Sequence, residues 1–152
     1  MNWIDKSPIT GTIVYRPPSW TNTNVEAEIS FNKPLGDVTI HNNSGNAVYE
    51  YTGNGVFEYL FQDKYGNTGS LETEVTWIDR EPPVCRVKDR PINGNSTNMV
   101  TLTDCNEPIT ILNNSGSNEY LFTGNGTFTF EYEDRAKNRS TTEVIMTEIR
   151  KP

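Results

Sequence analysis

The sequence predicts an all-β fold made of two consecutive small antiparallel β-sandwiches. Three observations support this: an internal repeat covers nearly the whole length, apolar and polar side chains alternate with a period of two, and Gly and Asn residues separate the alternating runs. No long amphipathic helical pattern is visible in the 152 residues. We therefore expect short strands joined by turns, arranged twice over.

The repeat fixes the expected domain boundary. Trp3-Ile4-Asp5 recurs as Trp77-Ile78-Asp79, 74 positions later, and Pro34 recurs as Pro108 at the same spacing. The motifs N-N-S-G at 42–45 and T-G-N-G at 52–55 recur at 113–116 and 123–126, now 71 positions later, so the second copy has lost three residues after Pro108. We expect one domain at residues 1–79 and a second at residues 80–152.

Strands in which apolar and polar side chains alternate are expected within each copy. Phe57, Tyr59 and Phe61 alternate with mostly polar neighbours, and the second copy repeats the pattern with Phe128, Phe130 and Tyr132. Alternation of this kind is typical of a strand that packs one face on a core. Further strands are expected at 25–31, 38–41, 48–51 and 71–78 and at their counterparts, which gives two facing sheets per copy.

Composition and charge limit the classes of partner. The net charge is -7, the wrong sign for following a phosphate backbone, so nucleic acid is not an expected partner. No apolar run approaches the roughly 18 residues of a membrane span, so membrane insertion of this segment is not expected either. The first residues lack the basic start of a signal peptide, and we expect the chain to be an excised segment of a larger exported protein.

A family resemblance follows from the shared frame of the two copies. T-G-N-G, then x-F-x-[FY]-x-[FY]-x-D, an Asn-containing turn and a strand leading to W-I-D-x-x-P-P together resemble the bacterial immunoglobulin-like (Big-type) repeats. The resemblance implies two tandem immunoglobulin-like antiparallel sandwiches, as found in surface-layer, adhesin and secreted proteins. It implies a monomeric, extracellular or cell-surface stalk, spacer or adhesive segment. Its expected partners are neighbouring modules of the parent chain and a host or cell-wall glycan or protein.

Two sets of residues are expected to shape turns. Glycines of the T-G-N-G motifs are expected to supply positive φ angles at corners; these are Gly53, Gly55, Gly124 and Gly126. Asp63 and Asp134 are expected to accept backbone N–H bonds across hairpin turns that end at Asn67 and Asn138. Because Lys137 stands where the first copy has Gly66, Asn138 is the expected left-handed residue of the second turn. Calcium at these aspartates is the weaker alternative, since each turn shows one carboxylate and calcium takes about six to eight oxygens.

The cysteines and the junction between the copies carry further expectations. Cys85 and Cys105 align with Gly11 and Phe31 on neighbouring strands, which predicts a cross-strand disulfide. Two reduced cysteines remain the alternative. Zinc is disfavoured because His41 is the single histidine.

The junction is expected to form a stiff interdomain linker in which Trp77 packs between the domains. Its residues are Trp77, Ile78, Asp79, Pro82 and Pro83.

A search for catalytic motifs favours a protein that is not an enzyme. His41 has no counterpart in the second copy, and no nucleotide-binding loop or zinc-protease motif occurs. A Lys–Asn isopeptide crosslink is disfavoured, because Lys33 is replaced by Glu107 and the copies share no lysine candidate. The alternative function is an accessory carbohydrate-binding module of a secreted glycoside hydrolase, for which the candidate sugar-stacking aromatics are Tyr15, Trp20, Tyr49 and Tyr65.

Overall fold

The structure, a computed structural model, describes residues 6–92, 94 and 97–147. The chain divides into two compact units, Met1–Ile78 (unit 1) and Asp79–Pro152 (unit 2), which are described separately. The division lies one residue before the boundary expected from the repeat. Both units are all-β apart from single-turn 3-10 helices in the described residues.

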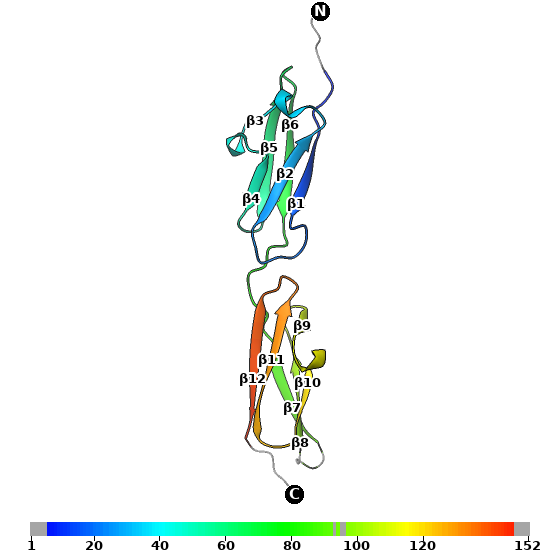
Figure 1. The fold of residues 1–152 in the computed structure, drawn as a ribbon, viewed down its shortest axis with the longest axis vertical. Coiled ribbons are helices and arrows are strands. Elements are labelled where there is room, and N and C mark those ends of the chain that lie inside the picture. The colour runs from blue at the N-terminus through cyan, green and yellow to red at the C-terminus, as the bar shows by residue number, and fades with distance from the viewer. Residues whose placement is uncertain (1–5, 93, 95–96, 148–152) are drawn as a thin grey trace, which may run out of the picture. The chain divides into compact units, whose positions relative to one another are not determined.

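Unit 1 contains two antiparallel sheets of three strands each (Figure 1). One sheet has the order β1-β2-β4, formed by Gly11–Arg16, Val25–Phe31 and Val48–Tyr51. The other has the order β3-β5-β6, formed by Val38–Ile40, Gly55–Asp63 and Thr68–Val75. Two 3-10 turns, η1 (Leu35–Asp37) and η2 (Asn43–Gly45), flank β3.

Unit 2 has the same order of elements. Its first sheet runs β7-β8-β10, formed by Arg86–Ile92, Thr97–Thr103 and Glu119–Phe122, and its second runs β9-β11-β12, formed by Ile109–Ile111, Gly126–Asp134 and Arg139–Met146. The 3-10 turn η3 (Asn114–Gly116) follows β9. In each unit the pairing of the strands matches the A-B-E and C-F-G sheets of an immunoglobulin sandwich, as expected from the sequence.

The core of each unit lies between its two sheets. In β5, Tyr59 and Phe61 are buried while Glu58 and Leu60 are exposed, and in β11 Phe130 and Tyr132 are buried. The alternation predicted from the sequence is therefore confirmed for these central strands. The first aromatic of each run stacks face to face on a tyrosine of the opposite sheet: Phe57 on Tyr49 and Phe128 on Tyr120, with ring centroids 3.9 Å apart in both cases.

The positions of the left-handed residues differ from the prediction. Gly53, Gly55, Gly124 and Gly126 do not have positive φ angles; the described glycines that do are Gly45, Gly66, Gly94 and Gly116. The T-G-N-G segments therefore turn without left-handed backbone. In the second aspartate turn, Lys137 itself takes a φ of 73°, close to the 89° of Gly66, so the expectation that Asn138 would take that conformation was wrong.

Candidate functional site

The candidate site lies at the end of each unit where the hairpin between its last two strands turns. We call residues Asp63–Asn67 and Asp134–Asn138 the aspartate turns of units 1 and 2. The pairing Val38↔Asp63 in unit 1 and Ile109↔Asp134 in unit 2 brings the loop before β3 or β9 beside the turn. The segment that enters each unit also passes this end, so three separate parts of the chain meet there.

The two aspartate turns share one hydrogen-bond frame. Asp63 Oδ1 accepts the N–H groups of Tyr65 and Asn67, each at 2.9 Å, and Asp134 Oδ1 accepts those of Ala136 and Asn138 at 2.8 and 2.9 Å. The side-chain amide of the closing asparagine donates to the other carboxylate oxygen, at 2.7 Å in unit 1 and 3.0 Å in unit 2. Each carboxylate thus holds its turn by three hydrogen bonds.

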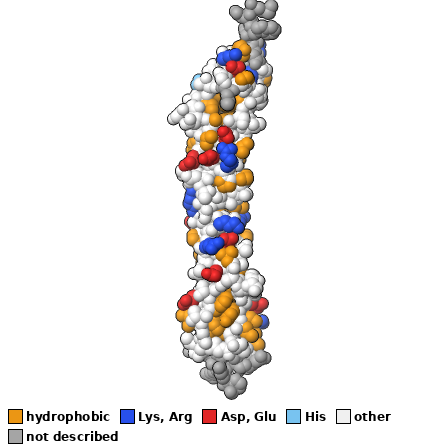
Figure 2. Space-filling model, in the orientation of Figure 1, with side chains coloured by type: hydrophobic (Ala, Val, Ile, Leu, Met, Phe, Trp, Pro, Cys, Tyr) orange, Lys and Arg blue, Asp and Glu red, His pale blue; other side chains and the backbone are white. Residues whose placement is uncertain are grey.

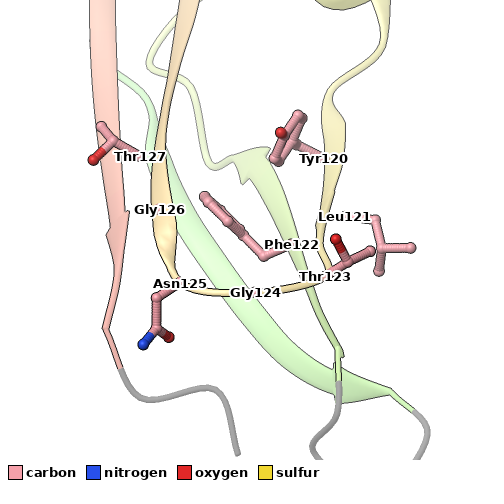
Figure 3. Close-up of a pocket in the computed structure, with 8 residues that line it drawn as sticks. All are labelled: Tyr120, Leu121, Phe122, Thr123, Gly124, Asn125, Gly126 and Thr127. Carbon is pink, nitrogen blue, oxygen red and sulfur yellow. The ribbon is translucent and has the colours of Figure 1, made fainter. Parts of the chain in front are cut away.

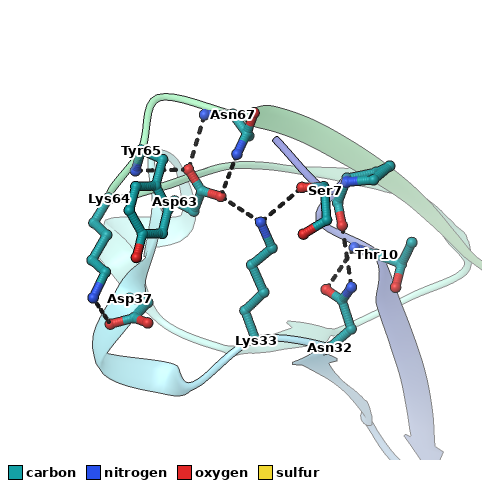
Figure 4. Close-up of polar contacts among 10 residues, drawn as sticks. Ser7, Thr10, Asn32, Lys33, Asp37, Asp63, Lys64, Tyr65 and Asn67 are labelled. Atoms are coloured by element: carbon teal, nitrogen blue, oxygen red, sulfur yellow. Dashed lines mark hydrogen bonds and ion pairs between the residues drawn. The ribbon is translucent and has the colours of Figure 1, made fainter. Parts of the chain in front are cut away.

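In unit 1 a lysine completes the site (Figure 4). Lys33, in the loop between β2 and η1, places Nζ 2.7 Å from Asp63 Oδ2 and 2.7 Å from the backbone oxygen of Ser7. The side chains of the pair are 8% and 0% exposed, which makes it a buried ion pair. Burial alone would raise the pKa of Asp63, but the hydrogen bonds from Lys33 and Asn67 outweigh it and hold the pKa well below its usual range.

This arrangement includes the residue types of an isopeptide crosslink, which the sequence comparison had set aside. Lys33, Asp63 and Asn67 do come together, although unit 2 has no lysine at the equivalent position. An ionised carboxylate facing the amine favours its protonated form. A protonated amine has no lone pair with which to attack a carbonyl carbon, so the arrangement acts as an ion pair.

In unit 2 two further carboxylates occupy this region. Oxygens of Asp79, Glu107 and Asp134 all lie within 4.8 Å of one another, the only such group of potential metal ligands among the described residues. Glu107 belongs to the loop between β8 and β9, and Asp79 is the first residue of the unit. Asn138 links Asp79 to Asp134, since its side-chain amide donates to the backbone oxygen of Asp79 at 2.7 Å and also to the Asp134 carboxylate.

The three acids of unit 2 differ in their pKa shifts. Burial, the hydrogen bond between the Glu107 and Asp134 carboxyl groups, and the nearby charges of Asp134 and Asp79 together raise the pKa of Glu107 to about 7. Burial would also raise the pKa of Asp134, but hydrogen bonds from Asn138 and the turn amides lower it below its usual value. One end of unit 2 therefore gathers three carboxyl groups, of which Glu107 holds its proton more tightly than usual, where unit 1 holds an ion pair.

Sequence reasoning singled out the aspartate turns but missed what lies next to them. It counted one carboxylate per turn, because the other two acids of unit 2 are distant in sequence. The available signal was the charge reversal between Lys33 and Glu107 at aligned positions, which it used only to dismiss a crosslink. Because strand pairing places the loop that contains this position beside the aspartate turn, the reversal indicates a difference in charge next to the two turns.

The disulfide joins Cys85 and Cys105 within unit 2. Cys85 directly precedes β7, and Cys105 follows Asp104, whose φ of 52° is left-handed. The two Cα atoms are 3.9 Å apart, and Cys85 packs in the core cluster that includes Val100 and Phe130. Unit 1 has Gly11 and Phe31 at these positions, paired directly across β1 and β2.

The junction residues are held by one unit or the other. Trp77 packs edge to face on Tyr15 and donates its indole N–H to the backbone oxygen of Pro17. The Asn54 side chain binds both the N–H and the C=O of Ile78, the last residue of unit 1. The expectation that Trp77 packs between domains stays untested, since its described contacts are with unit 1.

Beyond Ile78 the chain is fixed to unit 2. The backbone oxygen of Asp79 accepts from Asn138, as described above, and Asp79 Oδ1 accepts the N–H of Glu81. Pro82 is exposed, whereas Pro83 is buried and its backbone oxygen accepts from Ser140. Both ends of the junction are therefore hydrogen-bonded into a sandwich.

A hollow lies at the T-G-N-G turn of each unit, at the end opposite the aspartate turn. Figure 3 shows the one in unit 2, which measures about 290 Å³ and is lined by residues 120–127. Tyr120 and Phe122 point toward the sandwich, while Leu121 and Asn125 point away from it. None of the eight lining residues is charged, and the equivalent hollow of unit 1 is lined by residues 49–56. Neither hollow brings together groups suited to acid–base chemistry.

The aromatics considered for sugar stacking do not form one platform. Tyr15 and Tyr49 pack against core aromatics, which leaves Trp20 and Tyr65 exposed. Trp20 follows β1 near the Ile78 end of unit 1, whereas Tyr65 lies in the aspartate turn at the other end. On the face shown in Figure 2, acidic and basic side chains are interspersed and form no continuous basic surface.

Comparison of the chain with protein-family models, with curated proteins and with solved structures found no match in any of the three. Within the described residues, no helix has the length and apolar character that crossing a bilayer would require.

Proposed function

We propose that this chain is a non-catalytic spacer segment of a larger extracellular protein, in which two immunoglobulin-like units carry a partner domain at a set distance. The observation that supports this most directly is the junction. Ile78 is bound through both of its backbone polar groups by Asn54, and the next residue, Asp79, is bound by Asn138. A spacer needs such anchoring, because free residues between units would let them reorient independently.

The disulfide supports the extracellular part of the proposal. Disulfides persist in secreted and cell-surface proteins and are rare in reducing compartments. A sandwich of about 70 residues buries a modest core, so a covalent link between neighbouring strands is a common means of stabilising it there. The Cys85–Cys105 bond fits this pattern.

The spacer function is testable by measuring how freely the two units move. Nitroxide labels at Glu72→Cys and Glu143→Cys, both exposed positions on strands of different units, would report the distribution of distances between them by pulsed electron resonance. We expect a narrow distribution in the otherwise unaltered chain. Insertion of a short Gly-Ser segment between Ile78 and Asp79 is the matched control and should broaden it.

A second variant connects the width to the proposed anchor. Asn54→Ala removes both hydrogen bonds to Ile78 and is expected to broaden the distribution without unfolding unit 1. If the unaltered chain gave a distribution as broad as the Gly-Ser insertion, the spacer proposal would be wrong. A narrow distribution that Asn54→Ala leaves unchanged would also contradict the role given to this anchor.

A further inference from the structure

The position of Lys33 in unit 1 is taken by Glu107 in unit 2, and each residue lies in the loop that the sheet pairing places beside the aspartate turn. The turn frame itself is unchanged, with two backbone N–H groups and one asparagine amide donating to a buried carboxylate. Unit 1 sets an ammonium against this carboxylate, 2.7 Å from Asp63 Oδ2. Unit 2 sets there a group that can lose its proton within the ordinary range of pH.

The contact between Glu107 and Asp134 requires a proton. The two carboxyl groups hydrogen-bond to each other, and together with Asp79 their oxygens lie within 4.8 Å of one another. An ionised carboxylate only accepts hydrogen bonds, so one group of such a pair must be protonated. Asp134 already accepts from three donors of its turn, which favours its ionised form. Glu107 is therefore the group that holds the proton and donates it to Asp134.

Burial makes the loss of this proton costly. Asp134 is only 2% exposed, and Glu107 is half-buried. Two carboxylates at this distance repel each other, and the repulsion is stronger where water is excluded. An ordinary glutamate ionises with a pKa of about 4, whereas here the pKa of Glu107 is raised to about 7. The proton is thus held up to neutral pH.

The charges around Glu107 come from two other segments. Those that act most strongly on it are the carboxylates of Asp134, in the aspartate turn, and of Asp79, in the entering segment, and both disfavour its ionised form. Two charged neighbours are paired elsewhere: Lys137 lies 3.2 Å from Glu133, and Asp104 lies 3.7 Å from Lys88. The remaining charged residues of the entering segment and the turn are Arg80, Glu81 and Arg135.

We propose that Glu107 and Asp134 form a pH-sensitive switch in unit 2: they share one proton in mildly acidic solution, and its loss near neutral pH weakens the contact between the loop before β9 and the aspartate turn. Two ionised carboxylates would then face each other, with Asp79 beside them. The amide of Asn138 joins this turn to the backbone oxygen of Asp79, so the switch acts on how firmly the first residue of unit 2 is held. This inference does not rest on the spacer function.

The expected pH dependence of unit 2 is opposite in sign to that of unit 1. Folded unit 2 holds the Glu107 proton more tightly than the unfolded chain does. The stabilisation is therefore fully present below the unfolded pKa of about 4 and is lost as the pH rises through the folded value of about 7. The pKa of Asp63 is lowered instead, so unit 1 loses stability as the pH falls.

The test is calorimetric unfolding of the whole chain at about pH 5 and at about pH 8, with a chelator in every buffer so that no bound divalent cation contributes. We expect the transition of unit 2 to lie at lower temperature at the higher pH, with its equilibrium constant for folding reduced roughly tenfold or more. The transition of unit 1 should move less. All three tryptophans lie in unit 1, at positions 3, 20 and 77, so tryptophan fluorescence assigns its transition.

The variant Glu107→Gln isolates the proton, because its amide keeps a donor for Asp134 and does not titrate. It should remove the loss of stability between the two pH values and make unit 2 more stable than the unaltered chain at the higher one. Glu143→Gln, a change to an exposed acid on β12, is the control and should keep the loss. In the unaltered chain, the NMR signal of the Glu107 carboxyl carbon should titrate with a pKa of about 7, which decides the proposal even if the glutamine variant fails to fold.

Two outcomes would overturn the proposal. The first is a Glu107 carboxyl group that titrates in the usual range of a glutamate, with a pKa of about 4. The second is a Glu107→Gln variant in which unit 2 loses as much stability between the two pH values as it does in the unaltered chain. Neither outcome bears on the distance measurements that test the spacer function, so the two proposals fail separately.

Discussion

Units 1 and 2 build the same aspartate turn and complete it with opposite charges. In unit 1, Lys33 neutralises Asp63 inside the protein, and the ion pair is closed from water. In unit 2, Glu107 and Asp79 bring two further carboxyl groups beside Asp134, and no lysine is present at the position of Lys33. The turn itself depends on hydrogen bonds that both units keep, so its geometry does not reveal which charge lies next to it.

A second contrast concerns how the units are held together. Unit 2 has the Cys85–Cys105 bond, whereas unit 1 has Gly11 and Phe31 at these positions. Phe31 instead packs edge to face on Phe61, with ring centroids 4.8 Å apart. Unit 1 therefore has aromatic packing between its two sheets near this position and a buried ion pair at its turn, while unit 2 has a covalent bond between neighbouring strands. Two copies of one fold are thus stabilised at the same positions by different interactions.

The largest effect is expected from breaking the ion pair of unit 1. Asp63→Ala removes the acceptor of three turn hydrogen bonds and leaves the Lys33 ammonium buried without its carboxylate. Removing one partner of a buried pair is strongly destabilising, because the remaining charge is held away from water without its counter-ion. Urea unfolding followed by tryptophan fluorescence should show unit 1 losing more stability than in any other variant described here.

The control for that variant is an exposed ion pair between the same turn and η1. Asp37 and Lys64 approach to 3.4 Å, and the lysine side chain is 54% exposed. Asp37→Asn should shift the unfolding midpoint of unit 1 only slightly, since exposed pairs contribute little. If Asp63→Ala were as mild as Asp37→Asn, the buried pair would not be the feature that holds this end of unit 1.

The strands and the turns were predictable because their signals are local. Alternation with a period of two in residues 57–61 and 128–132 identified the buried faces, and Asp followed by Asn four residues later identified the turns. Left-handed backbone was predicted poorly. The T-G-N-G glycines do not require it, while Asn43 and Ser44 adopt it at φ of 54° and 52°.

The charges beside the turns could not be read from any one segment. Lys33 and Asp63 are 30 residues apart, and only the pairing of β3 with β5 brings them together. The acids of unit 2 likewise come from three segments, which a count of carboxylates per turn cannot reveal. Composition also gave no indication, since interspersed charges are the usual state of a protein surface.

An intermediate effect is expected from removing the disulfide. Cys85→Ala combined with Cys105→Ala should lower the free energy of unfolding of unit 2 by about 3 kcal/mol, the size expected for a closed loop of 20 residues. Calorimetry should show one transition moving to lower temperature, while the transition that tryptophan fluorescence assigns to unit 1 stays in place. Equal movement of both transitions would contradict the expectation that the disulfide stabilises unit 2 alone.

The smallest effect is expected from acidification, which should lower the stability of unit 1. The pKa of Asp63 is lowered in the folded state, so the folded protein holds this proton less tightly than the unfolded chain does. The stabilisation is therefore fully present above the unfolded pKa of about 4 and is lost progressively as the pH falls through the folded value. Between about pH 5 and pH 3, unit 1 should become less stable, as measured by urea unfolding with tryptophan fluorescence.

The variant Lys33→Met identifies how much of that pH dependence comes from the ion pair. Loss of the ammonium removes one cause of the lowered pKa of Asp63, so this pKa should rise toward its usual value. The hydrogen bonds from Asn67 and the turn amides remain and should keep part of the lowering. The loss of stability on acidification should then be shallower than in the unaltered chain, although the variant is less stable at neutral pH. An unchanged slope would mean that the turn hydrogen bonds alone set the pKa of Asp63, and that the lysine of unit 1 matters for packing rather than for charge.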